Sequence, residues 1–434
     1  MLTKEYINSK VSPFIKVRTA DNRELGLKPR RARRCKRELP PFSHFVFIRG
    51  KGFSSVNILS QKTCLVYINH EENGKSASKV LVRAFCFKGV GMKSAVLKSM
   101  EDLCIEERPM PMCKEYDVIV AVKVCGVCRT ERKAWAMGQK DLVLPRVLGH
   151  EIAGVVHQIG SKISKYYVGQ HVAVSPGLFC GKCVYCVSGL DHLCVNMRIL
   201  GFHVDGGYSQ YMLVPGFGQE PYILNEIPDN LDFKTASLSE PLACAYNLIS
   251  RLHVEQAQNI VILGGGPLGV LSALLSRYLS KANIIIVEPQ QNRRQQAQAY
   301  SHYQFASYTD AWQKLMELSK GLGAEVVLPC CPDSTALSSA VNMAAKRGRV
   351  GFLSGLTGTL SLDNTVLNII HYRELDLLGA YGCSLADTQK ALQLLASGAV
   401  DVYGLQDLEV SWQEIEKTIS NLEPSDHIFT YFIP

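Results

Sequence analysis

The 434-residue chain has no long hydrophobic run, and no stretch approaches the roughly 18 consecutive apolar residues of a membrane-spanning helix. Its first residues, MLTKEYINSKVSPF, also lack the apolar segment of a secretory signal. We therefore expect no membrane span, no export and a cytoplasmic location. The hydrophobic fraction of 47% and the charged fraction of 20% are ordinary for a globular protein. This length predicts two or three domains.

Acidic residues are scarce at the N-terminus. Residues 1–91 hold 19 Lys and Arg but only 6 Asp and Glu. Residues 92–434 hold 28 Lys and Arg and 33 Asp and Glu. The basic excess therefore belongs to the first segment, which is densest at KPRRARRCKR, residues 28–37. Such a patch is typical of nucleic-acid, membrane-surface or targeting segments. Two other interpretations stay open: a solvated, disordered arm, and a reading frame that starts too early.

An early start is suggested by Met92. The segment MKSAVLKSMEDLCIEERPMP, which begins there, predicts an N-terminal strand and hairpin. Within residues 1–91, the apolar runs HFVFI and TCLVYI each predict a strand, and no metal-binding pattern is present.

Cysteine is crowded into one short stretch. CGKCVYCVSGLDHLC, residues 180–194, has the spacing C-x2-C-x2-C-x7-C. Zinc binds four thiolates at tetrahedral corners with Zn–S near ~2.3 Å, and a site with four cysteines is structural because it has no open position. An iron–sulfur cluster is one alternative, and disulfides, which need an oxidising compartment, are the other. The predicted ligands are Cys180, Cys183, Cys186 and Cys194.

A second metal site is suggested upstream, by VCGVCRTE and LPRVLGHEIAGVVHQIG. Cys128, His150 and Glu151 are possible ligands of mixed type. Such a set can leave a coordination position free for water or substrate, as catalytic zinc sites do. Each residue alone is a weak signal, since a cysteine after an apolar strand is usually packing.

A dinucleotide-binding motif lies in NIVILGGGPLGVLSALLSRYLSKANIIIVEP, residues 259–289. The glycine run follows a β-branched strand and opens an apolar helix, and an acid stands 19 residues after the last glycine. The glycines allow a tight turn and a close approach to a pyrophosphate, which the helix N-terminus then binds. The candidate cofactor-binding residues are Gly264, Gly266, Pro267, Leu268, Gly269, Glu288 and Arg293.

The acid at the end of this motif bears on the choice of cofactor. The Glu288 carboxylate would accept hydrogen bonds from ribose hydroxyls and repel a 2′-phosphate, which favours NAD. Arg293 and Arg294 could neutralise that phosphate, so NADP stays an alternative. Further along the chain, strand and helix patterns alternate, which indicates a parallel, doubly wound sheet.

The metal-site segment GHEIAGVVHQIGSKI, residues 149–163, resembles the zinc signature of the zinc-dependent medium-chain alcohol dehydrogenase family. Glu151 together with Glu240 resembles the polyol and threonine dehydrogenase branch of that family. The other motifs fall in that family's order, and the resemblance covers residues 92–434. It implies an α/β protein with a GroES-like β-barrel catalytic domain (92–242) and a Rossmann domain (243–380). Residues 381–434 would return to the catalytic domain, and residues 1–91 would be a basic extension outside the resemblance.

The resemblance also implies roles for individual residues. Cys128 and His150 would bind a catalytic zinc, and Glu151 would ligate it or stand behind it. Glu240, in SLSEPLACAY, would approach the same metal, and Thr130 would begin a proton relay. Two positions depart from the family: Glu131 replaces the usual Asp, and Lys133 replaces a His that commonly passes the proton to solvent.

These features predict a zinc-dependent oxidoreductase that transfers hydride from a secondary alcohol of polyol or sugar type to NAD, with one catalytic and one structural zinc. L-threonine 3-dehydrogenase and butanediol dehydrogenase are the nearest alternatives. From other classes, a non-catalytic zinc- and NAD-binding protein and a nucleic-acid binder acting through the basic arm stay open. The resemblance implies a homodimer or homotetramer with a small-molecule alcohol substrate and no membrane partner.

Overall fold

The computed structural model describes residues 91–434, apart from 218–220, 356–363, 406 and 423–426, and the backbone of four strands before residue 91. The chain divides into two units, Met1–Gly89 and Val90–Pro434. In the first unit, β1 (Ile15–Arg18) pairs antiparallel with β2 (Glu24–Leu27), and β3 (Cys64–Glu72) with β4 (Lys75–Ala84). The strand predicted at TCLVYI is thus confirmed, whereas HFVFI and the basic run at 28–37 lie outside the described residues.

The second unit begins with the predicted hairpin. β5 (Gly91–Ser99) pairs antiparallel with β6 (Asp102–Pro109), and β8 (Arg146–Val147) joins the other edge of β5. Alternate residues of β5, such as Ala95 and Leu97, are fully buried. The strand and hairpin expected from Met92 onward are therefore present.

A seven-stranded sheet carries the N-terminal half of this unit. Its order is β14-β10-β9-β7-β22-β21, with β13 also paired to β7. All its pairs are antiparallel except β21 with β22. The strands are β7 (Val118–Gly126), β9 (Glu151–Ile159), β10 (His171–Val174), β13 (Tyr211–Val214), β14 (Leu224–Glu226), β21 (Asp407–Val410) and β22 (Phe429–Phe432).

A six-stranded, wholly parallel sheet follows, in the order β17-β16-β15-β18-β19-β20. The chain reverses its direction of winding between β15 and β18, and ligands of such sheets bind beyond the carboxyl ends of the strands at this point. The strands are β15 (Asn259–Leu263), β16 (Asn283–Val287), β17 (Tyr303–Phe305), β18 (Ala324–Pro329), β19 (Ala344–Phe352) and β20 (Asp376–Gly379).

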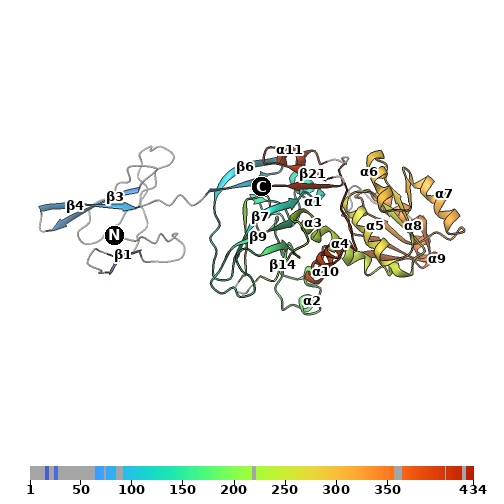
Figure 1. The fold of residues 1–434 in the computed structure, drawn as a ribbon, viewed down its shortest axis with the longest axis horizontal. Helices are drawn as coiled ribbons and strands as arrows, with labels where there is room; N and C mark the ends of the chain where they lie inside the picture. The colour runs from blue at the N-terminus through green and yellow to red at the C-terminus, as the bar shows by residue number, and fades with distance from the viewer. Residues whose placement is uncertain are drawn as a thin grey trace. The chain divides into compact units, whose positions relative to one another are not determined.

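Helices cover both faces of the parallel sheet (Figure 1). Successive side chains of β15 point to opposite faces: Ile260 and Ile262 pack in one core, and Val261 and Leu263 in another. The first core also takes α4 (Ser239–Ile249), α5 (Pro267–Leu279) and α10 (Leu385–Ala396), and the second takes α7 (Tyr308–Leu318), α8 (Ser334–Met343) and α9 (Asn364–Arg373). The predicted doubly wound α/β fold is confirmed.

Two helices connect the halves of this unit. The domain boundary expected at 242/243 falls inside α4, since this helix runs from Ser239 to Ile249. Glu240 of its first turn lies within 4.8 Å of Glu151 on β9, while its later residues belong to the core of the parallel sheet. Residues 381–434 were expected to return to the catalytic domain. Their strands β21 and β22 do join the seven-stranded sheet, whereas their helix α10 packs on α4. The domain limits themselves stay a prediction.

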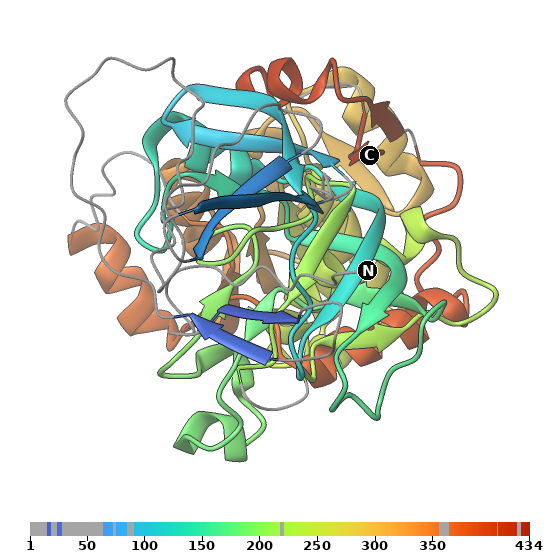
Figure 2. The ribbon, with the colours of Figure 1, turned by 90° about the vertical axis from the view of Figure 1, so that its left-hand side faces the viewer.

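The remaining elements are short. They are α1 (Arg129–Met137), β11 (Gly177–Leu178), α2 (Val184–Val187), η1 (Asp191–Leu193), β12 (Arg198–Ile199), α3 (Phe233–Ser237), η2 (Val254–Gln256), α6 (Gln291–Gln296), η3 (Ala297–Ala299) and α11 (Ile415–Ser420). The segment that carries α2 projects from the body of the second unit (Figure 2).

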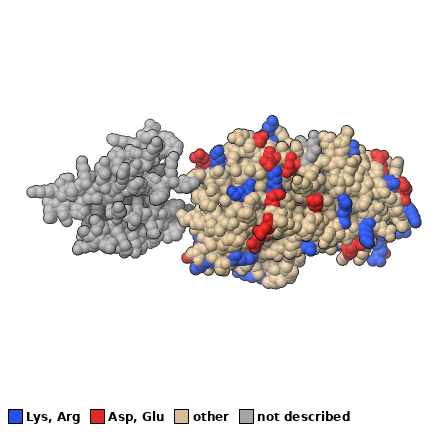
Figure 3. All heavy atoms as spheres, in the orientation of Figure 1, with Lys and Arg blue, Asp and Glu red and all other residues tan. Residues whose placement is uncertain are grey.

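No helix among the described residues is long and apolar enough to cross a membrane. On the face of the second unit drawn in Figure 3, basic and acidic side chains are interspersed, with no large patch of one sign. This agrees with the nearly balanced charge of residues 92–434, which hold 28 Lys and Arg and 33 Asp and Glu.

Candidate active site

The antiparallel pairing of β7 with β9 brings the first two predicted ligands together. The register places Gly126, the last residue of β7, opposite Glu151, the first residue of β9. Cys128 lies two residues beyond that pair as the N-cap of α1, and His150 lies one residue before it. β7 ends and β9 begins at the same end of the sheet, so the segments that follow β7 and precede β9 meet there.

The ligand atoms of these residues are close enough to share a metal ion. Cys128, Glu131 and His150 form one group whose atoms lie within 4.8 Å of one another, and His150, Glu151 and Glu240 form a second. Glu240 comes from the first turn of α4. His150 belongs to both groups, so the structure gathers all four predicted ligands around this imidazole. The hydroxyl Oγ1 of Thr130 lies 3.4 Å from the sulfur of Cys128.

Glu131 orients this site, which the sequence analysis did not predict. Its side chain is fully buried, and its Oε1 lies 2.5 Å from Nδ1 of His150. Its Oε2 accepts a hydrogen bond of 3.0 Å from the backbone N–H of Cys128. A metal-binding His usually donates its other ring N–H to such a partner, which fixes the ring and its tautomer. Its signals in the sequence were the capping position, three residues after Cys128, and the departure from the usual Asp.

The Glu151 carboxylate occupies space that is free only because its cross-strand partner, Gly126, has no side chain. A Cβ atom on Gly126 would lie 1.9 Å from Oε2 of Glu151. Tyr208, also fully buried, donates from its hydroxyl to the carbonyl oxygen of Gly126 at 3.2 Å. The backbone at the end of β7 is therefore held while the carboxylate lies directly against it.

Burial shifts the protonation equilibria of the site. It raises the pKa of Glu151 to about 8, with a contribution from Glu240, and it raises the pKa of Glu240 and of Cys128. Burial alone would lower the pKa of His150, but Glu131 and Cys128 raise it well above its usual value. Without a cation the site therefore retains protons, and a bound cation would replace them.

Two half-buried thiols that the sequence analysis did not assign to the site lie next to it. Cys244 Sγ donates to Oε1 of Glu240 at 3.5 Å, and Cys383 completes a group with both residues within 4.8 Å. Cys244 stands one helical turn after Glu240, and this spacing was its only signal. The position of Cys383 depends on how the segment before α10 packs.

The four crowded cysteines also converge. Their sulfur atoms all lie within 4.8 Å of one another, with Cys183 and Cys186 at 3.4 Å and Cys180 and Cys186 at 4.0 Å. All four are free thiols. Tetrahedral zinc at ~2.3 Å from each sulfur would place the sulfurs roughly 4 Å apart. The arrangement fits a zinc ion and not a pair of disulfides.

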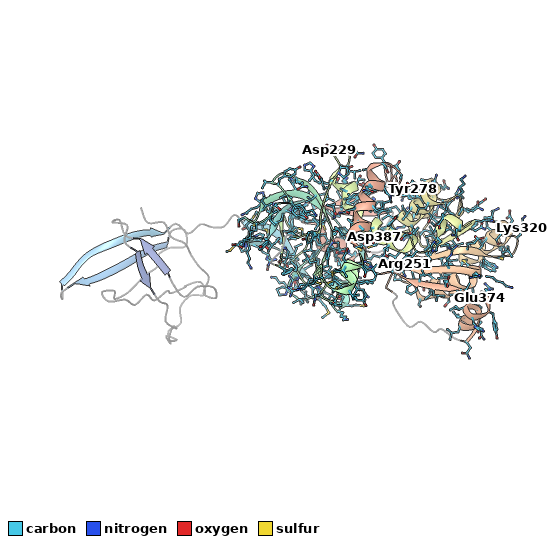
Figure 4. The ribbon with its side chains drawn as sticks, turned by 90° about the horizontal axis from the view of Figure 1, so that it is seen from below. Asp229, Arg251, Tyr278, Lys320, Glu374 and Asp387 are labelled. Atoms are coloured by element: carbon cyan, nitrogen blue, oxygen red, sulfur yellow. The ribbon has the colours of Figure 1, made fainter. Side chains whose placement is uncertain are left out.

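The thiols of this lobe differ in acidity. Backbone N–H groups of Cys186 and Val195 lower the pKa of Cys183 to about 6, whereas burial and the neighbouring thiols raise the pKa of Cys186 to about 12. The lobe is tied to α10, because Asp191 Oδ1 accepts the N–H of Leu385 at 3.1 Å. Arg251 and Asp387, labelled in Figure 4, are the other charged groups facing His192 at this junction.

The glycine run lies at the winding switch of the parallel sheet. Gly264 follows β15 with a φ of +114°, and a Cβ on Gly269 would lie 1.9 Å from the carbonyl oxygen of Gly264. Gly266 is the N-cap of α5, and Pro267 and Leu268 begin its first turn. The free N–H groups of this turn are a ready anion site. The predicted strand–glycine–helix geometry is therefore present.

The acid of the motif lies beside this turn. Glu288 is buried, and its two oxygens accept the N–H groups of Gly265 at 2.7 Å and Gln290 at 2.9 Å. Nη1 of Arg293 lies 3.5 Å from the place that a Cβ on Gly266 would occupy. Both a carboxylate and a guanidinium therefore border the predicted cofactor site.

Comparison with known proteins agrees with this arrangement. Residues 114–219 match the model of the alcohol dehydrogenase GroES-like domain, and residues 267–397 match that of the zinc-binding dehydrogenase domain. The chain is 31% identical over 295 residues to 2-dehydro-3-deoxy-L-galactonate 5-dehydrogenase of Pseudoalteromonas atlantica, covering 66% of this chain and 82% of that protein. It is 27% identical over 348 residues to D-xylulose reductase A of Aspergillus oryzae, covering 78% and 95% respectively.

A solved structure shares the same fold. The zinc-binding dehydrogenase of Sinorhizobium meliloti 1021, bound to NADP, matches with a TM-score of 0.72 and 27% identity, over 79% of this chain and 99% of that one. The predicted GroES-like and Rossmann fold class is confirmed. This chain is an oxidoreductase that belongs to the zinc-dependent medium-chain alcohol dehydrogenase family.

Proposed function

We propose that this protein oxidises a secondary alcohol that carries neighbouring hydroxyl groups, of polyol or sugar type, with NAD as the hydride acceptor. The observation that carries the proposal is the convergence of Cys128, His150, Glu151 and Glu240 in one place, in a unit that also contains a family-typical dinucleotide motif. L-threonine and butanediol are the alternative substrates.

The donor set fits a catalytic zinc ion. A thiol, an imidazole and two carboxyl groups are ligands that zinc accepts, and three of them leave one position open. Cys128 and His150 would hold the ion, with Glu151 or Glu240 as the third ligand. The pairing of Nδ1 of His150 with Glu131 leaves Nε2 for the metal. In the lobe, Cys180, Cys183, Cys186 and Cys194 would hold a second, structural ion.

The chemistry divides between bound groups and protein residues. When bound, zinc and the nicotinamide dinucleotide supply Lewis acidity and a hydride acceptor. Thr130, whose hydroxyl lies 3.4 Å from the Cys128 sulfur, would accept the proton of the alcohol while it gives up its own hydroxyl proton. Lys133 is exposed, and its Nζ lies 3.8 Å from the place of a Cβ on Gly355, so it borders the dinucleotide half. Lys133 replaces the imidazole that commonly passes the proton onward in this family, so proton release would proceed directly to water.

The preference for NAD rests on Glu288. Its buried carboxylate is fixed by two backbone N–H groups and would repel a 2′-phosphate. Arg293 and the NADP in the Sinorhizobium relative keep NADP as the alternative. The ratio of kcat/KM for the two cofactors tests this point. A ratio in favour of NADP would overturn the preference.

The substrate class rests on the two relatives and on the metal set. The names of both relatives refer to polyhydroxylated carbon chains. Glu240 stands where other branches of the family have a second cysteine ligand, as in the polyol and threonine branch. We further propose a homodimer or homotetramer, which light scattering on the purified protein would test, and a cytoplasmic location stays a prediction.

A panel of alcohols with metal analysis tests the function. We expect two zinc ions per chain and formation of NADH with at least one polyol or sugar. Cys128→Ser should lose one zinc and the activity. Cys113→Ser should keep both, because Cys113 is a partly buried thiol outside the candidate metal groups found among the described residues. Two bound zinc ions without NADH from any alcohol would instead support a non-catalytic zinc- and NAD-binding protein.

A further inference from the structure

Among the residues that the structure describes, one group of metal-binding side chains contains two thiols that neither predicted zinc site uses. It consists of Cys244 on α4, Cys383 just before α10, and Glu240 on α4, which it shares with the catalytic group. We call it the α4–α10 thiol site. The ligand atoms of the three residues lie within 4.8 Å of one another. Other neighbouring thiols lack this arrangement: Cys330 and Cys331 are adjacent but have no third ligand among the described residues.

We propose that the α4–α10 thiol site binds a thiophilic divalent cation, Zn²⁺ in the first instance, in addition to the catalytic and structural ions. Two thiolates and a carboxylate are a ligand set that Zn²⁺ and Cd²⁺ accept. Tetrahedral zinc needs its ligand atoms roughly 4 Å apart, which is within the spread of this group. The site would leave one position open for water.

The geometry of the site is fixed before any metal binds. Glu240 and Cys244 stand one turn apart on the same face of α4. The segment that carries Cys383 is held against that helix, because Asn247 Nδ2 donates to the carbonyl oxygen of Gly382 at 2.9 Å. Arg251 Nη1 binds the carbonyl oxygen of Gly379, also at 2.9 Å. Such preorganisation lowers the entropic cost of gathering the ligands.

The shared ligand gives the site a consequence for catalysis. Glu240 lies within 4.8 Å of His150 and Glu151 as well as of Cys244 and Cys383. A cation at the α4–α10 thiol site would draw the Glu240 carboxylate away from the catalytic set. Excess Zn²⁺ would therefore inhibit the enzyme. This last step rests on the proposed function, whereas the binding of the cation does not.

Metal counting on the full-length protein, kept reduced, tests the proposal. Wild type, the double variant Cys244→Ser/Cys383→Ser and the control Cys104→Ser/Cys113→Ser are dialysed against increasing free Cd²⁺. We expect the wild type and the control to bind one more equivalent of Cd²⁺ per chain than the double variant, because Cys104 and Cys113 belong to none of the candidate metal groups in the described part of the chain. Equal stoichiometry in wild type and double variant would overturn the proposal.

A second measurement guards against a misfolded variant. If the double variant does not fold, Cys383→Ser alone should lose the same equivalent of Cd²⁺. It leaves only Glu240 and Cys244, and two ligands are too few to hold the ion. In wild type, binding of the additional equivalent of Cd²⁺ should produce a new thiolate-to-cadmium absorbance. If that absorbance does not appear, the proposal is wrong. Inhibition is measured as the ratio of activities with and without excess Zn²⁺ in each protein. Loss of the extra equivalent without any change in that ratio would leave the binding site intact and refute only the regulatory consequence.

Discussion

At the residue scale, Glu131 makes the most specific contacts of the metal site. It binds Nδ1 of His150 and the backbone N–H of Cys128, so a single buried carboxyl group fixes two of the proposed ligands. The sequence shows it only as a departure from the usual Asp at a capping position. Its longer side chain reaches the imidazole in this fold, and the departure therefore raises no objection to the metal site.

We predict that Glu131→Gln weakens zinc binding at the catalytic site. Partners of metal-binding His residues typically contribute about 10–100-fold in metal affinity or activity. Competition with a chelator measures the affinity, with the lobe zinc as an internal reference. Glu115→Gln is the matched control, because Glu115 is exposed and pairs only with Lys162 at the surface. An affinity equal to that of wild type would show that Glu131 does not orient His150.

At the scale of elements, the junction of β7 and β9 positions the site. The Gly126–Glu151 cross-strand pair places the carboxylate against the strand backbone. The metal site therefore depends on strand register, and a shift of one residue would turn His150 and Glu151 to the other face.

We predict that Gly126→Ala both destabilises the protein and displaces Glu151. The new Cβ would lie 1.9 Å from Oε2 and 2.9 Å from the Cβ of Glu151, so one strand must move. Overpacking of this kind costs about 1–3 kcal/mol. Urea unfolding and zinc content are the measurements. In the control, Gly379→Ala, the nearest atom is 3.6 Å away, and both quantities should stay as in wild type. Full zinc content in Gly126→Ala would contradict the role of Glu151 near the metal.

At the scale of the whole molecule, the buried acids link metal binding to stability. Burial raises the pKa of Glu151 from 4.5 to about 8 and also raises that of Glu240. At pH values between the unfolded and the folded pKa of such a group, the folded chain binds more protons than the unfolded chain. The free energy of unfolding therefore falls as pH rises through that range. His150, whose pKa is also raised, acts in the same direction above its ordinary pKa of 6.5.

We predict that the metal-free protein loses stability between about pH 4.5 and 6, by at most about 1.4 kcal/mol per pH unit for each group. This window avoids the opposite effect of Cys183, whose pKa is lowered to about 6. Urea unfolding across the window measures the slope. The zinc-loaded protein and Glu151→Gln should both show a flatter dependence. A slope of the opposite sign in the metal-free protein would refute the raised carboxyl pKa.

The two units of the chain suggest a further prediction. Val90–Pro434 is a separate compact unit and holds every proposed site residue. A protein that starts at Met92 should therefore keep its zinc content and its kcat/KM. A loss of activity would show that the first unit contributes to the enzyme. If the basic arm binds nucleic acid, only the full-length chain should show salt-dependent binding.

The amino-acid sequence alone was sufficient for the local motifs and the fold class. The cysteine spacing of the lobe, the turn at Gly264 and the acid at Glu288 lie within short segments whose geometry a few residues determine. The alternation of strand and helix predicted the parallel sheet for the same reason, because each element follows its own hydrophobic period. The family resemblance then ordered these parts and supplied the roles of Cys128, His150 and Glu240.

Only the tertiary structure decided which of these residues meet. The partnership of Glu131 with His150 spans 19 residues and depends on the register of β7 and β9. The meeting of Cys244 with Cys383 depends on the packing of α4 against α10. No short-range pattern encodes such contacts, because strand register and helix packing are set by burial of the whole core, and the placement of single side chains follows from that burial.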